Sequence, residues 1–183
     1  MKLALIGLPQ SGKTTIFNAL TGSERAVAMS AGRIEVHTEV VDVPDERLRQ
    51  LADLYKAKKM LHAQISFADV AGVGAGDSGG GLSSQLLNAL AGMDGLLLVL
   101  RAFDDPAVPH PAESVNPARD LESLQDELLL NDLIIVERRS EKLAETRQKG
   151  GGNLQEADKQ LALLARLQEA LSENKPLRDL ELN

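Results

Sequence analysis

The stretch Gly7-Leu8-Pro9-Gln10-Ser11-Gly12-Lys13-Thr14 decides the fold, because it matches the phosphate-loop pattern GxxxxGK[ST] at every fixed position. An apolar run at residues 3–6 precedes it, and residues 13–20 read as a helix that stops near Gly22. A strand, a glycine-bounded turn and a helix N-terminus in this order direct backbone N–H groups at a phosphate. The alternative, a turn that merely joins a strand to a helix, is disfavoured by this context.

The residues of this loop are the predicted nucleotide ligands. We expect Lys13 to reach the β- and γ-phosphates of a bound nucleotide and Thr14 to offer its hydroxyl to Mg²⁺. The two glycines of the pattern allow the sharp backbone turn. The nucleotide-binding residues predicted from the loop are Gly7, Pro9, Gln10, Ser11, Gly12, Lys13, Thr14 and Thr15.

A second motif follows about 55 residues later. Residues 63–68 alternate apolar and polar side chains, which is typical of a strand, and run into Asp69-Val70-Ala71-Gly72, a DxxG motif. We expect Asp69 to hold Mg²⁺ through a water and the Gly72 N–H to meet the γ-phosphate. The predicted metal residues are therefore Thr14 and Asp69. The alternative is an ordinary turn, since Asp and Gly are common turn residues.

The loop after this motif bears on hydrolysis. Residues 72–81 contain six glycines, so we expect a mobile segment in the absence of ligand. Position 73 is Val73, and the glutamine that orients the attacking water in Ras-type enzymes is therefore missing. Hydrolysis needs another residue.

The remaining pattern predicts a doubly wound, mostly parallel α/β sheet. Residues 34–40 alternate as a strand, in which His37 and Thr38 are read as ordinary strand residues. A helix is predicted to start around residues 44–47, with Leu48, Leu51 and Leu54 on one face. Residues 82–91 predict a further helix, and residues 96–100 a fully buried strand.

From Asn116, a predicted N-cap, the chain changes character. Two amphipathic helical segments, residues 117–149 and 154–172, are separated by glycines and predict an antiparallel hairpin. We therefore divide the chain into a nucleotide-binding core (1–115), a helical hairpin (116–175) and the start of a return segment (176–183). Basic residues near the hairpin tip are either a solvated face with acidic partners or a docking surface: Arg138, Arg139, Lys142, Arg147 and Lys149.

Composition sets the remaining limits. The net charge of −7 argues against non-specific nucleic-acid binding by the whole surface. The chain has no cysteine and no long apolar run, so we expect a cytoplasmic protein without a membrane partner. Aromatic residues make up only 2%, which predicts an aliphatic core.

These motifs resemble the YchF family, the Obg-like ATPases of the TRAFAC class of P-loop proteins, over essentially the whole chain. Besides the phosphate loop, the similar landmarks are Val43-Pro44-Asp45-Glu46-Arg47-Leu48, Phe67-Ala68-Asp69-Val70-Ala71-Gly72, Val99-Leu100-Arg101-Ala102-Phe103 and Asn131-Asp132-Leu133. The resemblance implies a switch protein that binds and hydrolyses ATP or GTP with Mg²⁺, and a ribosome or another RNA-containing particle as partner.

The resemblance also implies individual roles and departures. The family replaces the missing glutamine with a histidine that aligns with His110, which is thus the predicted catalytic residue. Gln10 stands where the family has asparagine, which puts a bound monovalent cation in question. Arg33 stands at the Mg²⁺-closing threonine of the first switch, leaving Thr38 as a fallback for that role.

Two expectations concern the end of the chain. The sequence stops at Asn183, before the strand that would read the base, so we expect a longer protein with a C-terminal TGS domain. If it ended there, the apolar sheet edge at residues 96–100 would invite self-association.

Two other functions remain open: a non-catalytic interaction module that uses the hairpin on a P-loop scaffold, and a P-loop kinase, for which no acceptor pocket or lid is recognisable.

Overall fold

The computed structural model describes residues 1–24, 35–71, 84–150 and 153–181. The chain forms two compact units, one of residues 1–78 and 83–121 and the other of residues 79–82 and 122–183. The first unit holds the sheet and the second holds a pair of long helices. In the described part of the chain, no helix combines the length and the apolar character that crossing a membrane requires.

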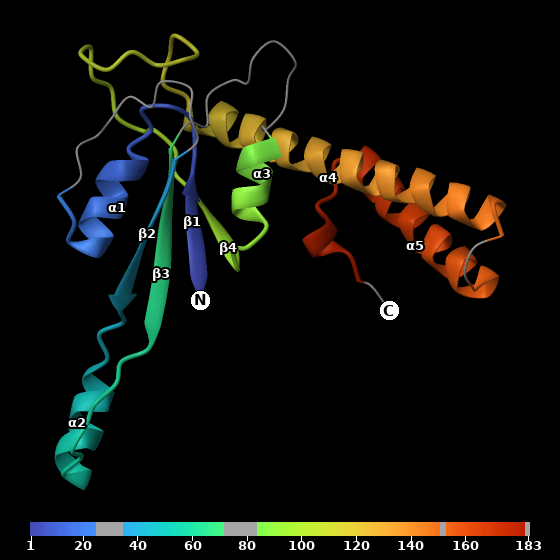
Figure 1. Ribbon diagram of the computed structural model, residues 1–183. Coiled ribbons are helices and arrows are strands. Elements are labelled where there is room, and N and C mark those ends of the chain that lie inside the picture. The colour runs from blue at the N-terminus through green and yellow to red at the C-terminus, as the bar shows by residue number, and fades with distance from the viewer. Residues whose placement is uncertain (25–34, 72–83, 151–152, 182–183) are drawn as a thin grey trace. The chain divides into compact units, whose positions relative to one another are not determined.

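A four-stranded sheet in the order β2-β3-β1-β4 forms the first unit (Figure 1). Its strands are β1 (Lys2–Ile6), β2 (Glu35–Asp42), β3 (Gln64–Ala71) and β4 (Gly95–Leu98). β1 is parallel to both β3 and β4, whereas β2 is antiparallel to β3. The mostly parallel α/β sheet predicted from the sequence is confirmed.

Helix α1 (Lys13–Thr21) follows β1 and packs on one face of the sheet. Its Phe17 is fully buried with Leu5 and Val99, and Phe67 packs against this cluster. The helix ends at Gly22, whose left-handed backbone (φ 69°) lets its N–H bond to the Asn18 carbonyl. The helix and its glycine stop are confirmed as predicted.

The connection from β2 to β3 extends away from the sheet and carries α2 (Glu46–Tyr55) (Figure 1). Asp45 caps this helix by accepting a hydrogen bond from the Arg47 N–H at 3.0 Å. The predicted leucine face does not belong to a core, because α2 contains no buried residue in the described part of the chain and its Leu48 is only half-buried. Leu51 is 51% exposed and Leu54 73%.

The prediction of a fully buried strand at residues 96–100 is wrong. The strand is β4, it ends at Leu98, and Leu96 and Leu97 are 38% and 37% exposed. The physical reason is its place in the sheet: β4 is the last strand in the order and pairs only with β1 among the described strands. Helix α3 (Ser84–Leu90) lies within the predicted helix 82–91.

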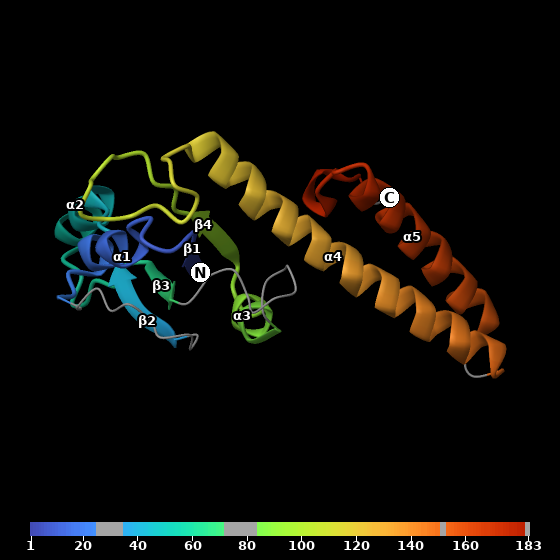
Figure 2. The same ribbon diagram turned by 90° about the horizontal axis from the view of Figure 1, so that it is seen from above.

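The second unit is built on α4 (Pro117–Gln148) and α5 (Leu154–Ser172), which run antiparallel side by side (Figure 2). Gln168 donates to Glu137 at 3.2 Å and Arg147 pairs with Asp158 at 2.7 Å, joining the two helices. The helical hairpin is confirmed. A short 3-10 helix, η1 (Leu177–Asp179), contacts α5 in the segment predicted to return to the sheet. The buried side chains of this unit are Leu124, Asn131, Val136, Ala157, Ala170 and Leu171.

Candidate functional site

The loop between β1 and α1 requires both of its glycines. A Cβ on Gly7 would lie 2.3 Å from the Val99 carbonyl oxygen and 2.9 Å from Ser11 Oγ, so no side chain fits there. Gly12 has φ +99°, in the left-handed region that disfavours L side chains. Gly7 is therefore fixed by its close approach to Val99, just after β4, and Gly12 by its backbone conformation.

Gln10 adopts an unusual conformation in the same loop. Its φ of 61° places a non-glycine residue in the left-handed region, where asparagine is much better tolerated. Both Pro9 and Gln10 are exposed, and the turn is closed by the Ser11 N–H donating to the Leu8 carbonyl at 3.3 Å. The departure noted at Gln10 is thus a strained position of the loop backbone.

Lys13 lies in the hollow of the loop. Its ammonium Nζ donates to the carbonyls of Gly7 and Leu8, both at 2.9 Å, and the residue is only 8% exposed. Burial lowers the pKa of Lys13 from its ordinary value, and the nearby charge of Asp69 offsets part of this effect. A buried cation held only by carbonyls is ready to accept an anionic partner.

Thr14, in the first turn of α1, meets Asp69, near the carboxyl end of β3. The Thr14 hydroxyl donates to Asp69 Oδ2 at 2.7 Å, and Asp69 is 2% exposed. Among the residues that the structure describes, two buried side-chain oxygens lack a hydrogen-bond partner, Asp69 Oδ1 and Ser11 Oγ. Unpartnered buried oxygens are costly, so their presence here indicates a place that a ligand completes.

The side-chain oxygens of Thr14 and Asp69 are of the kind that magnesium binds. Mg²⁺ prefers oxygen ligands, commonly takes only one or two from the protein, and fills its shell with water and phosphate oxygens. Within the described ranges no group of three or more His, Cys, Asp or Glu side chains could hold a metal by itself. Thr14 and Asp69 therefore fit a magnesium ion that a nucleotide shares, and do not form a separate metal cage.

Three further positions discussed from the sequence are not placed beside Lys13, Thr14 and Asp69 by the described residues. Thr15 is exposed on α1, and Gly72 and Arg33 lie outside the described residues. The whole glycine-rich loop 72–81 lies outside them too. The roles predicted for Gly72 and for the first switch therefore remain predictions.

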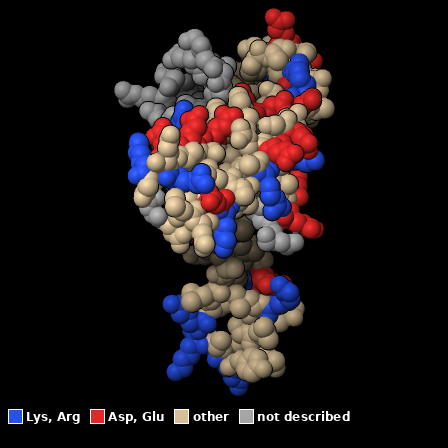
Figure 3. All heavy atoms as spheres, turned by 90° about the vertical axis from the view of Figure 1, so that its right-hand side faces the viewer, with Lys and Arg blue, Asp and Glu red and all other residues tan. Residues whose placement is uncertain are grey.

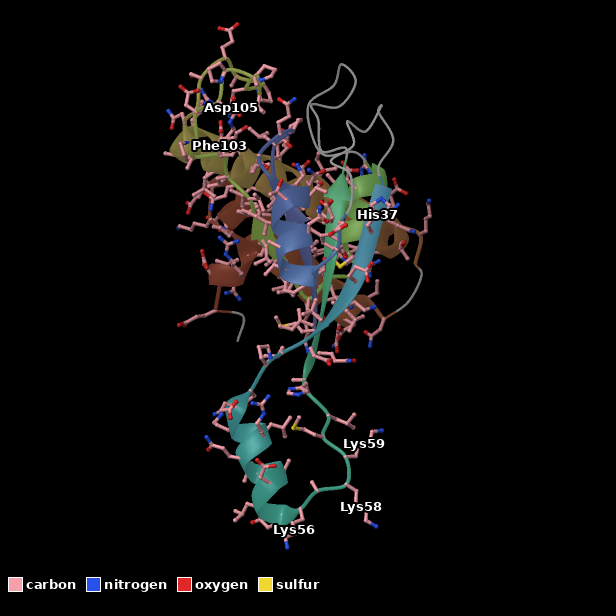
Figure 4. The ribbon with its side chains drawn as sticks, turned by 90° about the vertical axis from the view of Figure 1, so that its left-hand side faces the viewer. His37, Lys56, Lys58, Lys59, Phe103 and Asp105 are labelled. Carbon is pink, nitrogen blue, oxygen red and sulfur yellow. The ribbon has the colours of Figure 1, made fainter. Side chains whose placement is uncertain are left out.

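The pairing of β2 with β3 places His37 and Thr38 on opposite faces of the sheet. His37 is opposite Asp69, and Thr38 is opposite Ala68. Since directly opposed residues share a face of the sheet, Thr38 lies on the face away from Asp69, which does not favour the fallback role considered for it. His37, which the sequence pattern did not single out, shares the face of Asp69 and lies on β2 toward the end that carries the phosphate loop (Figure 4).

His110 is held inside the loop that follows β4. Its Nε2 lies 2.9 Å from Asp120 Oδ2, and its Nδ1 accepts the Ala112 N–H at 3.1 Å. Because Nδ1 is an acceptor, the proton resides on Nε2 and points at the carboxylate. The side chains of His110 and Asp120 are each 4% exposed. Both ring nitrogens are thus occupied, Nδ1 within this loop and Nε2 by the first turn of α4 (Pro117–Gln148).

Arg101 organises that loop, and the sequence analysis gave it no role. It is 2% exposed and donates to the carbonyls of Phe103 (3.1 Å), Asp105 (3.3 Å) and Pro109 (3.5 Å). Its guanidinium also lies 4.8 Å from the centre of the Phe103 ring. Figure 4 shows Phe103 and Asp105 on this loop. Only its place in the motif 99–103 could have pointed to Arg101, since an arginine beside an apolar strand has no distinctive pattern.

A mostly parallel sheet whose first strand leads through a glycine-bounded loop to a buried lysine and a paired Thr and Asp defines a P-loop nucleotide-binding protein. The sequence model of a family described as "50S ribosome-binding GTPase" matches residues 2–139. The Ribosome-binding ATPase YchF of Bacillus subtilis is 36% identical, over 97% of this chain and 48% of the relative. The Obg-like ATPase 1 of Oryza sativa subsp. japonica is 37% identical, over 89% of this chain and 40% of the relative. The chain belongs to the YchF and Obg-like ATPase family.

A solved structure gives the same result. The YchF GTPase of Schizosaccharomyces pombe superposes with a TM-score of 0.78 at 31% identity, over all of this chain and 50% of that one. The chain spans about half the length of the relatives it matches. The activity and partners of the whole protein are therefore a matter of proposal.

Proposed function

We propose that this chain binds a nucleoside triphosphate with Mg²⁺ in the β1–α1 loop and hydrolyses its terminal phosphoanhydride. One observation carries the proposal: a buried Lys13 bound only to carbonyls stands in the same loop–helix turn as the Thr14–Asp69 pair, which has an unpartnered oxygen. Phosphates would supply the anion that the lysine lacks, and magnesium the cation that the carboxylate lacks. The names of the relatives, an ATPase and a GTPase, support the reaction class.

Each residue of the loop has a defined task in this proposal. Lys13 exchanges its carbonyl partners for the β- and γ-phosphate oxygens, which compensates the cost of its burial. Residues 7–15 wrap the phosphates with backbone N–H groups, with Ser11 Oγ as a further hydrogen-bonding group. Bound magnesium would neutralise charge that develops on the phosphates, and Thr14 and Asp69 would hold it. Gly72 remains the proposed contact to the γ-phosphate.

His110 is the proposed residue that orients the attacking water. In the ligand-free arrangement its two nitrogens are bound to Asp120 and Ala112, so the loop must release Nδ1 from the Ala112 N–H before a water can take that place. Asp120 can keep its bond to Nε2 throughout this change. Released in this way, Nδ1 is an acceptor for a water proton, the role that a water-positioning residue needs.

Binding is tested by titrating fluorescent ATP and GTP derivatives into the protein with Mg²⁺. Lys13→Ala should abolish binding, because it removes the buried cation of the loop. Lys142→Ala, an exposed lysine of α4, is the matched control and should leave affinity unchanged. Unchanged affinity in Lys13→Ala would refute the proposal. Both nucleotides are needed because no residue that reads the base has been identified.

Hydrolysis is tested by phosphate release at saturating nucleotide. His110→Ala should slow turnover and leave nucleotide affinity within about twofold, since it removes a group needed only for the chemical step. An equal loss of affinity and turnover would count against the assignment. Nucleotide binding without phosphate release would favour the second candidate, an interaction module in which the α4–α5 hairpin acts on a P-loop scaffold.

The proposal extends to the setting of the protein. We infer a cytoplasmic protein that associates with ribosomes, on the strength of relatives named as ribosome-binding. Co-sedimentation of the protein with purified ribosomes, with and without nucleotide, tests this part. Protein that stays in the supernatant under all conditions would contradict it.

A further inference from the structure

The end of α2 and the residues after it form a projecting tip, residues 54–61, which we name the α2 tip (Figure 4). It presents large side chains to solvent: Leu54 is 73% exposed, Tyr55 77% and Leu61 71%. Lys56, Lys58 and Lys59 are exposed on the same short stretch. Aromatic and apolar side chains beside lysines on a projection are unusual for a surface that contacts only water.

The charge of the α2 tip differs from that of the chain. The whole chain carries −7, yet no acidic residue occurs between Asp53 and Asp69. Within the described residues, none of the three lysines has a carboxylate within ion-pair distance. Basic side chains are prominent on the face of this projection in Figure 3. The tip is thus an uncompensated cationic site on an acidic protein.

Backbone hydrogen bonds hold the start and the base of the α2 tip. Lys56 has φ 49°, and its N–H bonds to the Ala52 and Asp53 carbonyls and ends the helix. The Ala57 N–H also bonds to the Ala52 carbonyl, at 2.9 Å. At the base, the Val43 N–H donates to the Ala63 carbonyl at 2.8 Å, joining the two arms of the projection. A partner therefore meets Tyr55 and Lys56 on a helix end whose backbone is held by hydrogen bonds.

We propose that the α2 tip binds single-stranded RNA, with the three lysines on phosphates and the Tyr55 ring stacked on a base. RNA satisfies both features at once, since its backbone requires cations and its unpaired bases stack on aromatic rings. An acidic protein fits less well, because lysine is depleted from protein interfaces. This inference adds an RNA-binding surface to the ribosome association proposed above. It rests on that proposed association only for the particle that would supply the RNA.

The basic cluster of the hairpin is a weaker candidate for the same role. Arg147 pairs with Asp158 at 2.7 Å, and Lys149 lies 3.7 Å from Glu145. Glutamates at 137, 141 and 145 alternate with its basic residues along α4. Two of its five basic residues are therefore paired with carboxylates, and the other three have glutamates near them in the sequence, which the α2 tip lacks. This cluster provides the matched control for the α2 tip.

The test measures fluorescence anisotropy of a labelled single-stranded RNA of about ten nucleotides over a range of KCl concentrations. Substituting all three tip lysines by glutamine should lower the slope of log affinity against log salt by about 2, since each phosphate contact on a single strand contributes about 0.7. At about 0.1 M salt this corresponds to a roughly hundredfold loss of affinity. The control variant, R138Q/R139Q/K142Q, should keep the wild-type slope.

Tyr55 gives an independent measurement. Tyr55→Ala should weaken RNA binding about tenfold without changing the salt slope, because stacking releases no counterions. Tyr55→Phe keeps the ring and should bind as the wild type does. Equal losses in both Tyr55 variants would remove stacking from the proposal.

The outcomes separate this inference from the proposed nucleotide site. The tip variant should bind fluorescent nucleotide normally, which also shows that it is folded, and Lys13→Ala should bind RNA normally. No RNA binding by the wild type, or equal binding by the tip variant, would overturn the inference and leave the nucleotide site untouched. Equally tight, lysine-dependent binding to phosphatidylserine vesicles or polyglutamate would overturn it too, because the tip would then be a general anion-binding surface.

Discussion

At the scale of single residues, we expect the buried charge of Lys13 to lower the free energy of unfolding of the ligand-free protein. Its ammonium is buried and its pKa is lowered by that burial, so the charged form is disfavoured in the folded protein. We predict that Lys13→Met raises the free energy of unfolding of the ligand-free protein by about 1 kcal/mol while abolishing nucleotide binding. Urea unfolding without nucleotide measures this, with Lys142→Met as control. A less stable Lys13→Met would contradict it.

The gain in unfolding free energy of Lys13→Met over the wild type should depend on pH. A lysine whose folded-state pKa lies below its ordinary value of 10.5 binds fewer protons in the folded than in the unfolded chain between those two values. The destabilisation of the folded protein by the buried charge of Lys13 is therefore fully present at neutral pH, and it disappears as the pH rises through the lowered pKa toward 10.5. The advantage of Lys13→Met over the wild type should shrink over that interval and remain constant below it.

Asp120 is predicted to be the main structural partner of His110. It is 3% exposed, and besides His110 it accepts from Arg119 at 2.8 Å. Asp120→Ala leaves His110 Nε2 without its acceptor and the Arg119 guanidinium with Ser114 as its remaining acceptor residue, and should cost about 2–4 kcal/mol of stability. A double-mutant cycle with His110→Ala should return a coupling energy of at least about 1 kcal/mol from urea unfolding. Additive effects would show that the two side chains act independently.

The sequence could predict only part of this residue pair. His110 was found through a family resemblance, which compares positions along the chain. Asp120 carries no motif and looks like any acidic residue in the first turn of a helix, where carboxylates are common. Its pairing depends on how the loop folds back on that turn, and no local pattern encodes this. By contrast, Thr14 and Asp69 were predictable, because each belongs to its own motif at the end of a strand.

At the scale of elements, Arg101 should hold the loop after β4 in shape. Arg101→Lys cannot reproduce a planar guanidinium that donates to three carbonyls and lies over Phe103. We predict a loss of about 1–3 kcal/mol in unfolding free energy and faster proteolysis at residues 102–115. Arg49→Lys on exposed α2 is the control and should change neither measurement. A loop as protease-resistant as in the wild type would contradict this role.

Helix α5 should depend on its N-cap. The Asn153 side chain accepts from the N–H groups of Gln155 at 3.1 Å and Glu156 at 3.4 Å. Asn153→Ala removes this cap and should destabilise the hairpin by about 1 kcal/mol, whereas Asn153→Asp keeps an acceptor and should cost less. Thermal unfolding followed by circular dichroism compares the two variants. Equal losses would mean that the cap contributes nothing.

Elements were predictable where their signal is local. The start of α1 follows from the phosphate loop, and its end follows from Gly22, whose left-handed conformation suits glycine. The burial of β4 was misjudged because an apolar run looks the same in a central and an edge strand. The exposure of the α2 leucines was equally invisible, since amphipathic spacing predicts a face without saying what covers it.

At the scale of the whole molecule, the sequence predicted the fold class and the hairpin, and it set the boundary between core and hairpin at the start of the helix. The predicted core ended at residue 115, and the two compact units divide at 121/122, inside α4. The first turn of α4 carries Asp120, whose bonds to His110 and Arg119 tie that turn to the preceding loop. A helix boundary is a local property, whereas a unit boundary depends on contacts between distant residues.

The sheet edge gives the last prediction, for the 183-residue chain as a whole. β4 is the end strand of the described sheet, and its Leu96 and Leu97 are 38% and 37% exposed. An apolar strand with one free row of backbone groups is a template for pairing with another chain. We therefore expect concentration-dependent self-association of this chain in analytical ultracentrifugation. Leu97→Lys places a charge on the edge and should shift the protein toward monomer, because inserted charges block edge pairing.

The control for this experiment is Leu130→Lys, which adds the same charge at an exposed apolar position of α4 in the other unit. It should leave self-association unchanged if β4 is the contact. A wild-type chain that stays monomeric at all concentrations would contradict the prediction, and equal effects of the two lysine variants would assign the association to net charge. The pair of variants thus separates a specific strand edge from general colloidal behaviour, to which added charge contributes wherever it is placed.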